Sequence, residues 1–467
     1  MKLDLKPDRI KVNAGENFRG IGKFDNFSET PEGCYKNEGV PDRRMYRNHL
    51  HRLVYKVLSE LTGKTLPWGT LTGVRPTKQA LEMERLGYDH NQIVTYFGNE
   101  YLASERKANL AVKVTENERR LLAGMSFEDT YSLYVGVPFC PSICLYCSFS
   151  SYPLKQYATS VEAYVSALLK EIEETAKLFE NKKLVSIYFG GGTPTTLSAE
   201  QLETIIKKIK SCFNLDHLKE WTVEAGRPDS ITREKLETLK RLGVNRISVN
   251  PQTMKQETLD LIGRRHTVEE TVEAFKLARE TGFDNINMDL IAGLNGETID
   301  DFKYTLSELQ KLNPDSITVH TLAVKRAARL NEKMDEYGAS MSKDAALMTD
   351  YAEKFMEENG YEPYYLYRQK NMSDNLENIG YARPGKEGLY NVLIMEECHT
   401  IAACGPGASS KLVRTDEEYG AGFLNEAQDG EYVVRKIERC ENVKSVKDYI
   451  ERIDEMIERK HKLFLGE

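Results

Sequence analysis

Hydrophobic and polar positions follow two alternating periods between about Tyr131 and Lys325. Short apolar runs typical of strands are followed by longer stretches whose apolar residues recur every three or four positions, the spacing of an amphipathic helix. The predicted strands are Tyr131–Val137, Leu184–Phe189, Glu220–Glu224, Arg246–Val249, Asn285–Ile291 and Ser316–Leu322. The predicted helices are Tyr164–Ala176, Ala199–Ile209, Thr232–Leu242, a short helix around Thr258, Val268–Glu280 and Ile299–Leu312. The pattern predicts six βα-type units.

Strands that alternate with helices predict an α/β fold with a parallel sheet, because each crossover must return over one face of the sheet. Six units fit either a doubly wound sheet or an incomplete (β/α)6 barrel. Both architectures build their sites at the carboxyl ends of the strands. The unusual polar residues of this region lie at those ends, and we expect the incomplete barrel.

The segment before the βα units does not show their alternating pattern of strands and helices. It has a strand-like start and then predicted helices at Tyr46–Leu61 and Asn91–Leu102. Between these helices lies Leu66–Lys78, a loop dense in Gly, Pro and Thr. This loop is either a connection capped by Thr77 or an anion-binding or docking loop that uses Arg75 and Lys78.

The segment after the βα units contains further predicted elements. They are a helix Lys343–Glu358, a strand Tyr364–Arg368, a glycine-rich run Cys404–Lys411 and a charged helix Val446–Leu463. A chain of 467 residues is long enough for two to four domains of roughly 150 residues. We expect an amino-terminal, mainly helical accessory domain at 1–125, the partial barrel at 126–330 and an α/β domain that covers the substrate at 331–467.

Charge and hydropathy exclude several classes of protein. The chain has 72 Asp and Glu against 64 Lys and Arg, so it lacks a basic field that would attract nucleic acid. No apolar stretch of about 18 residues is present to span a membrane. The first residues alternate apolar with charged side chains, unlike a signal peptide, so we expect a cytoplasmic protein.

Three of the eight cysteines form a tight group, Cys140, Cys144 and Cys147, directly after the first predicted strand. Structural disulfides are rare in a reducing compartment, so such a group indicates metal or redox chemistry. A structural zinc site needs four ligands, and no nearby Cys or His supplies the fourth. Three thiolates suit a four-iron cluster and leave one iron open to an external ligand. The alternatives are buried free thiols or a redox pair.

This spacing at the end of a first βα strand resembles the radical S-adenosylmethionine (SAM) superfamily. The resemblance implies a [4Fe-4S] cluster whose open iron binds the amino and carboxylate groups of SAM and donates an electron to its sulfonium. Homolysis then gives a 5′-deoxyadenosyl radical. Cys140, Cys144 and Cys147 are, on this resemblance, the cluster ligands and the catalytic centre.

A glycine-rich turn follows the second predicted strand. Gly190, Gly191 and Gly192 precede Thr193, and glycines let a backbone approach a ligand and expose its N–H groups. A turn of this kind alone is a weak signal. Beside the cysteine loop, it resembles the superfamily's motif for the SAM amino group.

Four polar residues mark the ends of later strands: Glu224, Gln252, Arg264 and Asp289. Taken singly, each acid is equally well read as a helix cap or a surface ion pair. Together, acids and amides can hold ribose hydroxyls and an ammonium group, while an arginine can pair with a carboxylate. They resemble the SAM ligands of the oxygen-independent coproporphyrinogen III oxidase branch.

That narrower resemblance extends over nearly the whole chain. It includes Asp289–Leu294, Pro67–Gly69 and Gly73–Pro76, and the last two look like the bacterial coproporphyrinogen dehydrogenase subgroup. It implies that the radical abstracts hydrogen from a propionate β-carbon of coproporphyrinogen III. Loss of carbon dioxide and one electron, twice per substrate, then gives protoporphyrinogen IX in haem biosynthesis. A flavodoxin or ferredoxin would supply electrons.

One motif departs from this branch. Its well-characterised decarboxylases have a Cys-x-Cys arrangement at the third ligand, whereas this chain reads Cys147-Ser148-Phe149, the Cys-x-Phe form of the haem-chaperone members. Two alternatives therefore stay open: an anaerobic haem-degrading radical SAM methyltransferase, and a non-enzymatic haem-binding chaperone. The long amino-terminal domain counts against the chaperone.

A coproporphyrinogen brings four carboxylates, so its site needs cations to offset their desolvation. The candidates are Arg265, Lys325, Arg326, Arg329, Arg368, Lys370 and Arg383, each of which is equally well read as a solvated surface charge. Tyr364, Tyr365 and Tyr367 could stack on a macrocycle, or simply alternate between the faces of a strand.

Overall fold

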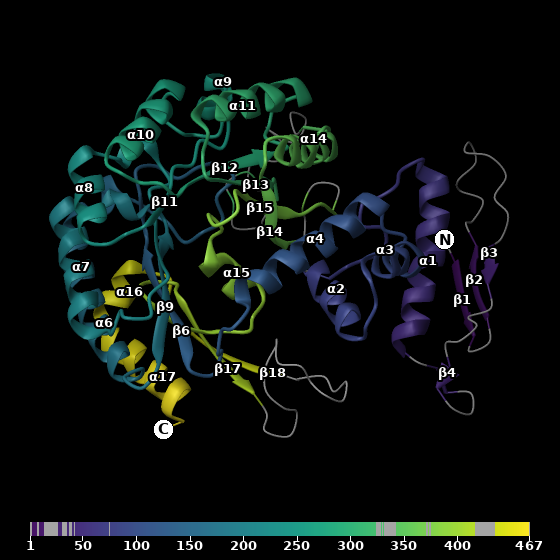
Figure 1. Cartoon of the computed structure of the whole chain (residues 1–467), viewed down its shortest axis with the longest axis horizontal. Coiled ribbons are helices and arrows are strands. Elements are labelled where there is room, and N and C mark those ends of the chain that lie inside the picture. The colour runs from purple at the N-terminus through teal and green to yellow at the C-terminus, as the bar shows by residue number, and fades with distance from the viewer. Residues whose placement is uncertain are drawn as a thin grey trace. The chain divides into compact units, whose positions relative to one another are not determined.

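The computed structural model describes most of the chain. The described residues are 2–6, 9–13, 27–29, 35–36, 40–41, 43–73, 75–323, 328, 330, 342–369, 372, 375–415 and 435–466. They fall into two compact units (Figure 1). The first is Met1–Thr115 with Asp374–Leu376, and the second is Glu116–Ser373 with Glu377–Glu467.

The first unit combines short antiparallel strands with helices. The strands are β1 (Lys2–Lys6), β2 (Arg9–Asn13) and β3 (Phe27–Glu29) in one sheet, and β4 (Tyr35–Lys36) paired with β5 (Val40–Pro41). The helices are α1 (Arg43–Thr62), α2 (Pro76–Arg85), α3 (His90–Tyr101) and the first part of α4 (Glu105–Leu122). The helices predicted from apolar spacing correspond to α1 and α3, whereas no helix is predicted at α2, whose first three residues fall within the predicted loop Leu66–Lys78.

The loop before α2 has a structural role. Trp68 is fully buried, and a Cβ at Gly69 would lie 2.1 Å from the Tyr101 carbonyl oxygen, so only glycine fits there. The prediction that Thr77 caps the following helix is wrong. Arg75 is the N-cap residue and Pro76 occupies the first turn, where its fixed φ suits a helix and its missing N–H is not needed.

The second unit is built on a parallel sheet whose strands follow the order of the chain. They are β6 (Thr130–Val137), β9 (Lys183–Gly191), β10 (Glu220–Glu224), β11 (Arg246–Ser248), β12 (Ile286–Ala292) and β13 (Ser316–Thr321). Each pairs in parallel with the next. A doubly wound sheet reverses its strand order at a switch point, and this one does not. The predicted α/β fold with a parallel sheet is confirmed.

Helices connect these strands and cover the outside of the sheet (Figure 1). They are α6 (Val161–Lys177), α7 (Ala199–Cys212), α8 (Arg233–Arg241), α9 (Gln256–Leu261), α10 (Val268–Glu280) and α11 (Ile299–Leu312). Local sequence fixes their starts. Ser198 and Gln201, for example, form a capping box at the start of α7, and the apolar residues spaced three or four apart on that helix are buried.

Strands from the last third of the chain extend the same sheet on both sides. Beside β13 lie β15 (Asn378–Ala382) and β14 (Glu362–Tyr367), both antiparallel to their neighbours. Beside β6 lie β16 (Thr400–Cys404), which is parallel to it, and then β17 (Ser409–Thr415) and β18 (Arg435–Glu441). The residues predicted as a separate carboxyl-terminal domain thus belong to the sheet, and their substrate-covering role stays a prediction.

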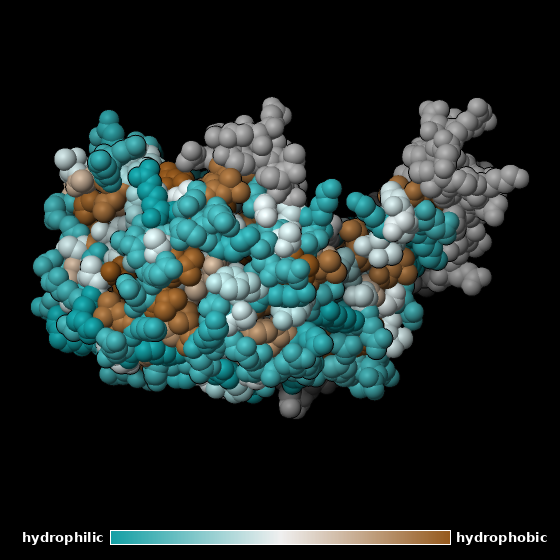
Figure 2. Space-filling model, turned by 90° about the horizontal axis from the view of Figure 1, so that it is seen from above, coloured by the Kyte–Doolittle hydropathy of each residue, from teal (hydrophilic) through white to brown (hydrophobic). Residues whose placement is uncertain are grey.

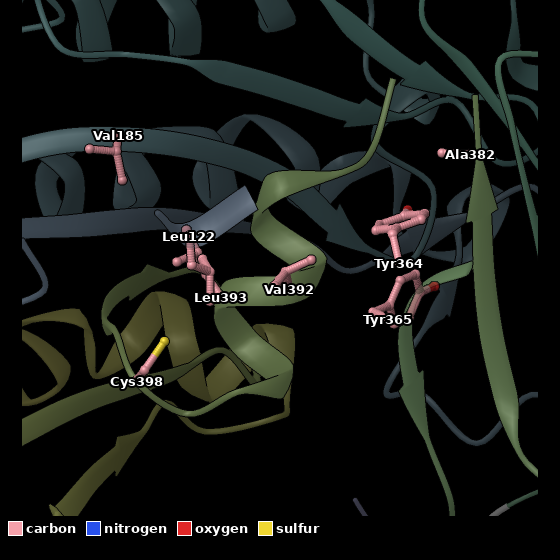
Figure 3. Packing of buried hydrophobic residues seen from close by; sticks show 8 residues of the cluster. All are labelled: Leu122, Val185, Tyr364, Tyr365, Ala382, Val392, Leu393 and Cys398. Atoms are coloured by element: carbon pink, nitrogen blue, oxygen red, sulfur yellow. The ribbon is translucent and has the colours of Figure 1, made fainter. Parts of the chain in front are cut away.

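The remaining helices pack around these strands: α14 (Ala345–Glu358), α15 (Leu389–Met395), α16 (Val446–Glu451) and α17 (Ile453–Leu465). Helix α15 contributes Val392 and Leu393 to a buried apolar cluster. Figure 3 shows these two side chains between Val185 of β9 and the rings of Tyr364 and Tyr365 on β14.

A buried ion pair ties α17 to α6. The Lys460 ammonium donates to the Glu171 carboxylate at 2.8 Å, and both side chains are almost completely buried. Tyr449 and the Gly405 backbone N–H also donate to Glu171, at 2.5 and 2.8 Å. Gly405 has a φ of +105°, and a Cβ there would lie 2.2 Å from the Gly136 carbonyl oxygen in β6. The carboxyl-terminal helices are therefore fixed to α6 and, through Gly405, to the first strand of the parallel run, β6.

The face of the molecule shown in Figure 2 is mainly hydrophilic where the structure describes it, with separate hydrophobic patches. Within the described residues, no helix is both long enough and apolar enough to cross a membrane.

Candidate functional site

A cavity of about 360 Å³ lies in the second unit, among the carboxyl ends of the parallel strands. Ten of the eleven predicted site residues line it: Cys140, Cys144, Cys147, Gly191, Gly192, Thr193, Glu224, Gln252, Arg264 and Asp289. Gly190 lies directly behind the wall, where a Cβ would come within 3.3 Å of the Glu224 carboxyl group. The residues selected from the sequence are thus brought together.

The three cysteines lie on one loop that leaves β6 through the short strand β7 (Phe139–Cys140) and returns at β8 (Tyr152–Pro153), which precedes the one-turn helix α5 (Leu154–Tyr157). Backbone hydrogen bonds hold its fold, such as Cys147 N–H to the Cys144 carbonyl at 3.2 Å. The Thr193 hydroxyl donates to Cys140 Sγ at 3.6 Å. Burial raises the pKa of Cys140 to about 11 and also raises the pKa of Cys147. These thiolates therefore need a bound cation to stabilise their charge.

The arrangement of the thiols bears on which metal group fits. Within the described residues, no three His, Cys, Asp or Glu side chains gather closely enough to hold one ion. A zinc ion needs its ligands around a single point, whereas each thiolate of a four-iron cluster binds a different iron. Three cysteines that share one cavity without converging on a point fit the predicted cluster.

The glycine-rich turn packs tightly against the cysteine loop. Gly191 has a φ of +105°, and a Cβ at Gly192 would lie 2.5 Å from the Phe139 carbonyl oxygen. The Gly192 and Thr193 N–H groups donate to the Val137 and Phe139 carbonyls, both at 2.7 Å. The expectation that these two N–H groups are exposed for a ligand is therefore wrong. The glycines are needed because two loop backbones approach each other closely.

Glu224 ends β10 and points toward a group of tyrosines. The Tyr188 hydroxyl donates to Glu224 Oε1 at 2.5 Å. The Tyr188 ring stacks on Tyr390 with 4.6 Å between centroids, and Tyr134 continues the stack. Burial raises the pKa of Glu224 to about 7, while the Tyr188 hydrogen bond opposes that rise. The neighbouring Asp289 adds to the rise in the Glu224 pKa, whereas His320 and Arg246 oppose it.

Asp289 lies in a different environment, although it is on the neighbouring part of the wall. Burial raises its pKa, but the nearby His320 and a hydrogen bond from Asn287 outweigh burial and hold the pKa below its ordinary value. The Asn287 amide donates to Asp289 Oδ1 at 2.7 Å, and His320 Nε2 lies 3.7 Å from Oδ2. One cavity thus presents an ionised carboxylate and a second carboxyl that titrates near neutrality.

Gln252 has a φ of +69°, which is uncommon for a residue with a side chain. Its backbone pairs with β12, since its N–H donates to the Asp289 carbonyl at 2.9 Å and its carbonyl accepts from Ile291 at 3.0 Å. These bonds hold Gln252 in the left-handed conformation, so its strain occurs at a cavity-lining residue.

Arg264 is buried and its guanidinium is anchored to backbone. It donates to the carbonyls of Asn250 and, at 3.3 Å, of Gly226. Its Nε–H has no hydrogen-bond partner among the described residues. A buried cation with an unused donor beside a cavity is suited to an anionic group such as a carboxylate.

Several cavity residues were not selected from the sequence: Tyr188, Arg227, Arg246, Asn250 and His320. Tyr188 and His320 occur within apolar runs that predicted strands, and Arg246 lies at the start of β11, the end opposite to the expected site. Its side chain is buried and still reaches the cavity. The only available signal was the Arg-Pro pair at Arg227, three residues after Glu224.

The cations expected to bind substrate carboxylates differ in their exposure and in whether the structure describes them. Arg265 is exposed, and Arg383 donates to Asn313 at 2.5 Å and to the Asn359 carbonyl at 3.3 Å. Arg368 is buried, which lowers its pKa to about 10. Lys325, Arg326, Arg329 and Lys370 lie outside the described residues. Tyr365 and Tyr367 line the cavity.

Comparisons with known proteins agree with this geometry. Residues 134–309 match the radical SAM superfamily. The chain is 39% identical over 423 residues to the oxygen-independent coproporphyrinogen-III oxidase-like protein HemZ of Bacillus subtilis, covering 90% of this chain and 84% of that protein. It is 37% identical over 195 residues to the haem chaperone HemW of the same organism, covering 42% and 51%. The solved structure of Escherichia coli coproporphyrinogen III oxidase, HemN, has the same fold, with a TM-score of 0.54, 24% identity and coverage of 72% of each chain.

Proposed function

The chain belongs to the oxygen-independent coproporphyrinogen-III oxidase-like branch of the radical SAM superfamily, and we propose that it decarboxylates coproporphyrinogen III oxidatively to protoporphyrinogen IX. Membership implies a [4Fe-4S] cluster and SAM as cofactors. The observation that carries the proposal is the convergence of ten predicted cofactor residues on one cavity, together with a relative named as coproporphyrinogen-III oxidase-like that matches most of the chain.

Cys140, Cys144 and Cys147 are the proposed cluster ligands. They share one loop and line the cavity. Burial raises the pKa of Cys140 and Cys147, and a bound cluster would stabilise their thiolate forms. When bound, the cluster and SAM would supply the radical chemistry that removes hydrogen from a propionate side chain. Loss of carbon dioxide from each of two propionates would also release one electron, which a one-electron acceptor must take up.

The protein's own residues bind and orient SAM in this proposal. Arg264 would pair with the SAM carboxylate, since it lines the cavity and a guanidinium and a carboxylate form charge-assisted hydrogen bonds. Glu224, Gln252 and Asp289 hold the ribose hydroxyls and the ammonium group.

The tetrapyrrole would approach from the open side of the cavity. Tyr365 and Tyr367 line it with stacked rings, 6.3 Å between centroids, and Arg246 adds a buried cation. Aromatic rings suit the pyrroles, and a buried cation suits a propionate. A flavodoxin or ferredoxin is the proposed electron donor.

The test is anaerobic incubation of the reconstituted protein with SAM, a reductant and coproporphyrinogen III, followed by mass spectrometry. We expect two successive losses of carbon dioxide from the substrate. The Cys144→Ala variant should lose both the cluster absorbance and 5′-deoxyadenosine formation. Retention of either property in this variant would contradict the assignment of Cys144 as a cluster ligand. If the protein instead converted haem to a methylated, ring-opened product, the proposed function would be a methyltransferase and not a decarboxylase.

A second candidate function, haem delivery as a chaperone, is favoured by one observation. Phe149, in the Cys-x-Phe arrangement, is 70% exposed at the rim of the cavity. An exposed aromatic ring beside the cysteine loop suits an apolar macrocycle. Haem titration followed by absorbance separates the functions: tight haem binding that weakens in Phe149→Ala, without turnover of coproporphyrinogen, would support the chaperone.

A further inference from the structure

Arg227 contacts the proposed cluster loop from a neighbouring strand end. Its backbone is extended, with φ −128° and ψ 114°, and Pro228 follows it. A residue before proline is restricted to extended conformations, so the sequence fixes the direction of this backbone. The side chain is 2% exposed. A buried guanidinium is thus held beside the cavity.

Arg227 donates hydrogen bonds to three residues. Nε and Nη2 donate to the two carboxylate oxygens of Asp229, at 3.0 and 2.8 Å. Nη1 donates to the Ser142 hydroxyl at 3.1 Å, to the Ser142 carbonyl at 3.3 Å and to Cys144 Sγ at 3.7 Å. Asp229 therefore orients the guanidinium so that Nη1 faces the cysteine loop and the Cys144 sulfur.

We propose that Arg227 is a positioning residue that raises the reduction potential of the cluster by donating to Cys144. The inference rests on the proposed function, because it requires Cys144 to be a cluster ligand. Adding an electron makes a thiolate-bound cluster more negative, and a nearby cation stabilises the reduced form. Hydrogen bonds to cluster sulfurs act in the same direction.

The burial of Arg227 strengthens this effect. A cation at the surface would be screened by water and salt, whereas a buried one acts through a medium of lower dielectric constant. Asp229 offsets part of the charge, but its side chain is partly exposed and lies on the far edge of the guanidinium. Arg264, a second buried cation that acts on Cys144, is anchored to the Asn250 and Gly226 carbonyls and belongs to the proposed SAM site.

The test is a redox titration of reconstituted protein without substrate, read by absorbance and electron paramagnetic resonance, with iron content measured in parallel. In Arg227→Gln we expect full iron content and at least a tenfold shift of the reduction equilibrium toward the oxidised cluster, about 59 mV for a one-electron couple. Arg227→Lys keeps the positive charge but lacks the rigid, planar set of donors of a guanidinium. The shift of its reduction potential should therefore be smaller than that of Arg227→Gln.

Two controls separate tuning from support of the loop. Arg265→Gln removes an exposed arginine of the same charge, and Ser142→Ala removes a loop contact of Arg227 but leaves the cation in place. Both should keep the wild-type potential. An unchanged potential in iron-loaded Arg227→Gln, or loss of the cluster in both Arg227 variants, would overturn this inference alone. A wild-type protein that forms no cluster would overturn the proposed function as well.

Discussion

Tyr188→Phe tests how the cavity sets the charge of Glu224. The Tyr188 hydroxyl donates to Glu224 at 2.5 Å and so opposes the effect of burial, which raises the pKa of this carboxyl to about 7. If ionised Glu224 is the form that binds SAM, the ionised fraction controls affinity. That fraction is about one tenth at pH 6 and about nine tenths at pH 8, so the wild type should bind SAM about tenfold more tightly at pH 8 than at pH 6.

Removing the hydroxyl takes a donor from the ionised form. A hydrogen bond to a charged group contributes about 1.5–3 kcal/mol, and one pKa unit corresponds to about 1.4 kcal/mol. The Glu224 pKa should therefore rise by about one to two units in Tyr188→Phe. The sign is fixed: protonated Glu224 persists to higher pH, so the pH at which SAM affinity is half-maximal moves upward. At pH 7 the variant should bind SAM about fivefold to fiftyfold more weakly.

The assay is isothermal titration calorimetry of SAM with the reconstituted protein under anaerobic conditions, from pH 6 to pH 9. Tyr390→Phe is the matched control, because it removes a hydroxyl from the adjacent ring of the same stack. Its midpoint should stay at the wild-type value. Glu224→Gln should bind weakly, without this titration. A Tyr188→Phe midpoint equal to that of the wild type, or shifted downward, would refute the reasoning.

Two further predictions concern stability. Lys460→Met leaves the Glu171 carboxylate buried without its cation and should lower the free energy of unfolding by about 3–5 kcal/mol in urea denaturation, with part of the loss recovered when Glu171→Gln is added. A deficit under 1 kcal/mol would show that the pair contributes little. Gly405→Ala places a methyl group against the Gly136 carbonyl and should lower the melting temperature more than Gly385→Ala, which has a similar positive φ but open space around it. Equal melting temperatures would contradict the steric account.

Features of the fold that depend on hydrophobic periodicity, or on the order of the elements along the chain, could be predicted from the sequence. Apolar spacing located the parallel strands and their helices, because each element buries one face on its own core. The position of polar residues after strands then predicted which side chains meet, since the carboxyl ends of parallel strands share one edge. Cys144, Glu224 and Asp289 are far apart in the chain and line one cavity for this reason.

Contacts between strands could not be predicted in this way. The placement of β16 beside β6 joins residues about 270 positions apart, and its glycine-rich run gave no sign of the partner. The hydrogen bond from Tyr188 to Glu224 depends on the register of β9 against β10, which periodicity does not fix to one residue. The prediction for Thr77 failed for a different reason. Threonine is a good N-cap residue, but Pro76 suits the first turn of a helix, so α2 begins earlier and Arg75 is its N-cap residue.

Three polar groups that line the cavity are each oriented by a neighbour that does not itself need to bind the ligand. Tyr188 orients Glu224, Asn287 orients Asp289, and Asp229 orients Arg227. A buried polar group without a partner is destabilising, so these neighbours stabilise the cavity wall as well as positioning its ligand atoms. Among the described residues, three cavity-lining atoms have no such partner: the Nε–H groups of Arg246 and Arg264 and the Ser151 hydroxyl. A ligand that accepts hydrogen bonds at these arginines should offset part of that cost, and the carboxylate of SAM is the proposed acceptor at Arg264.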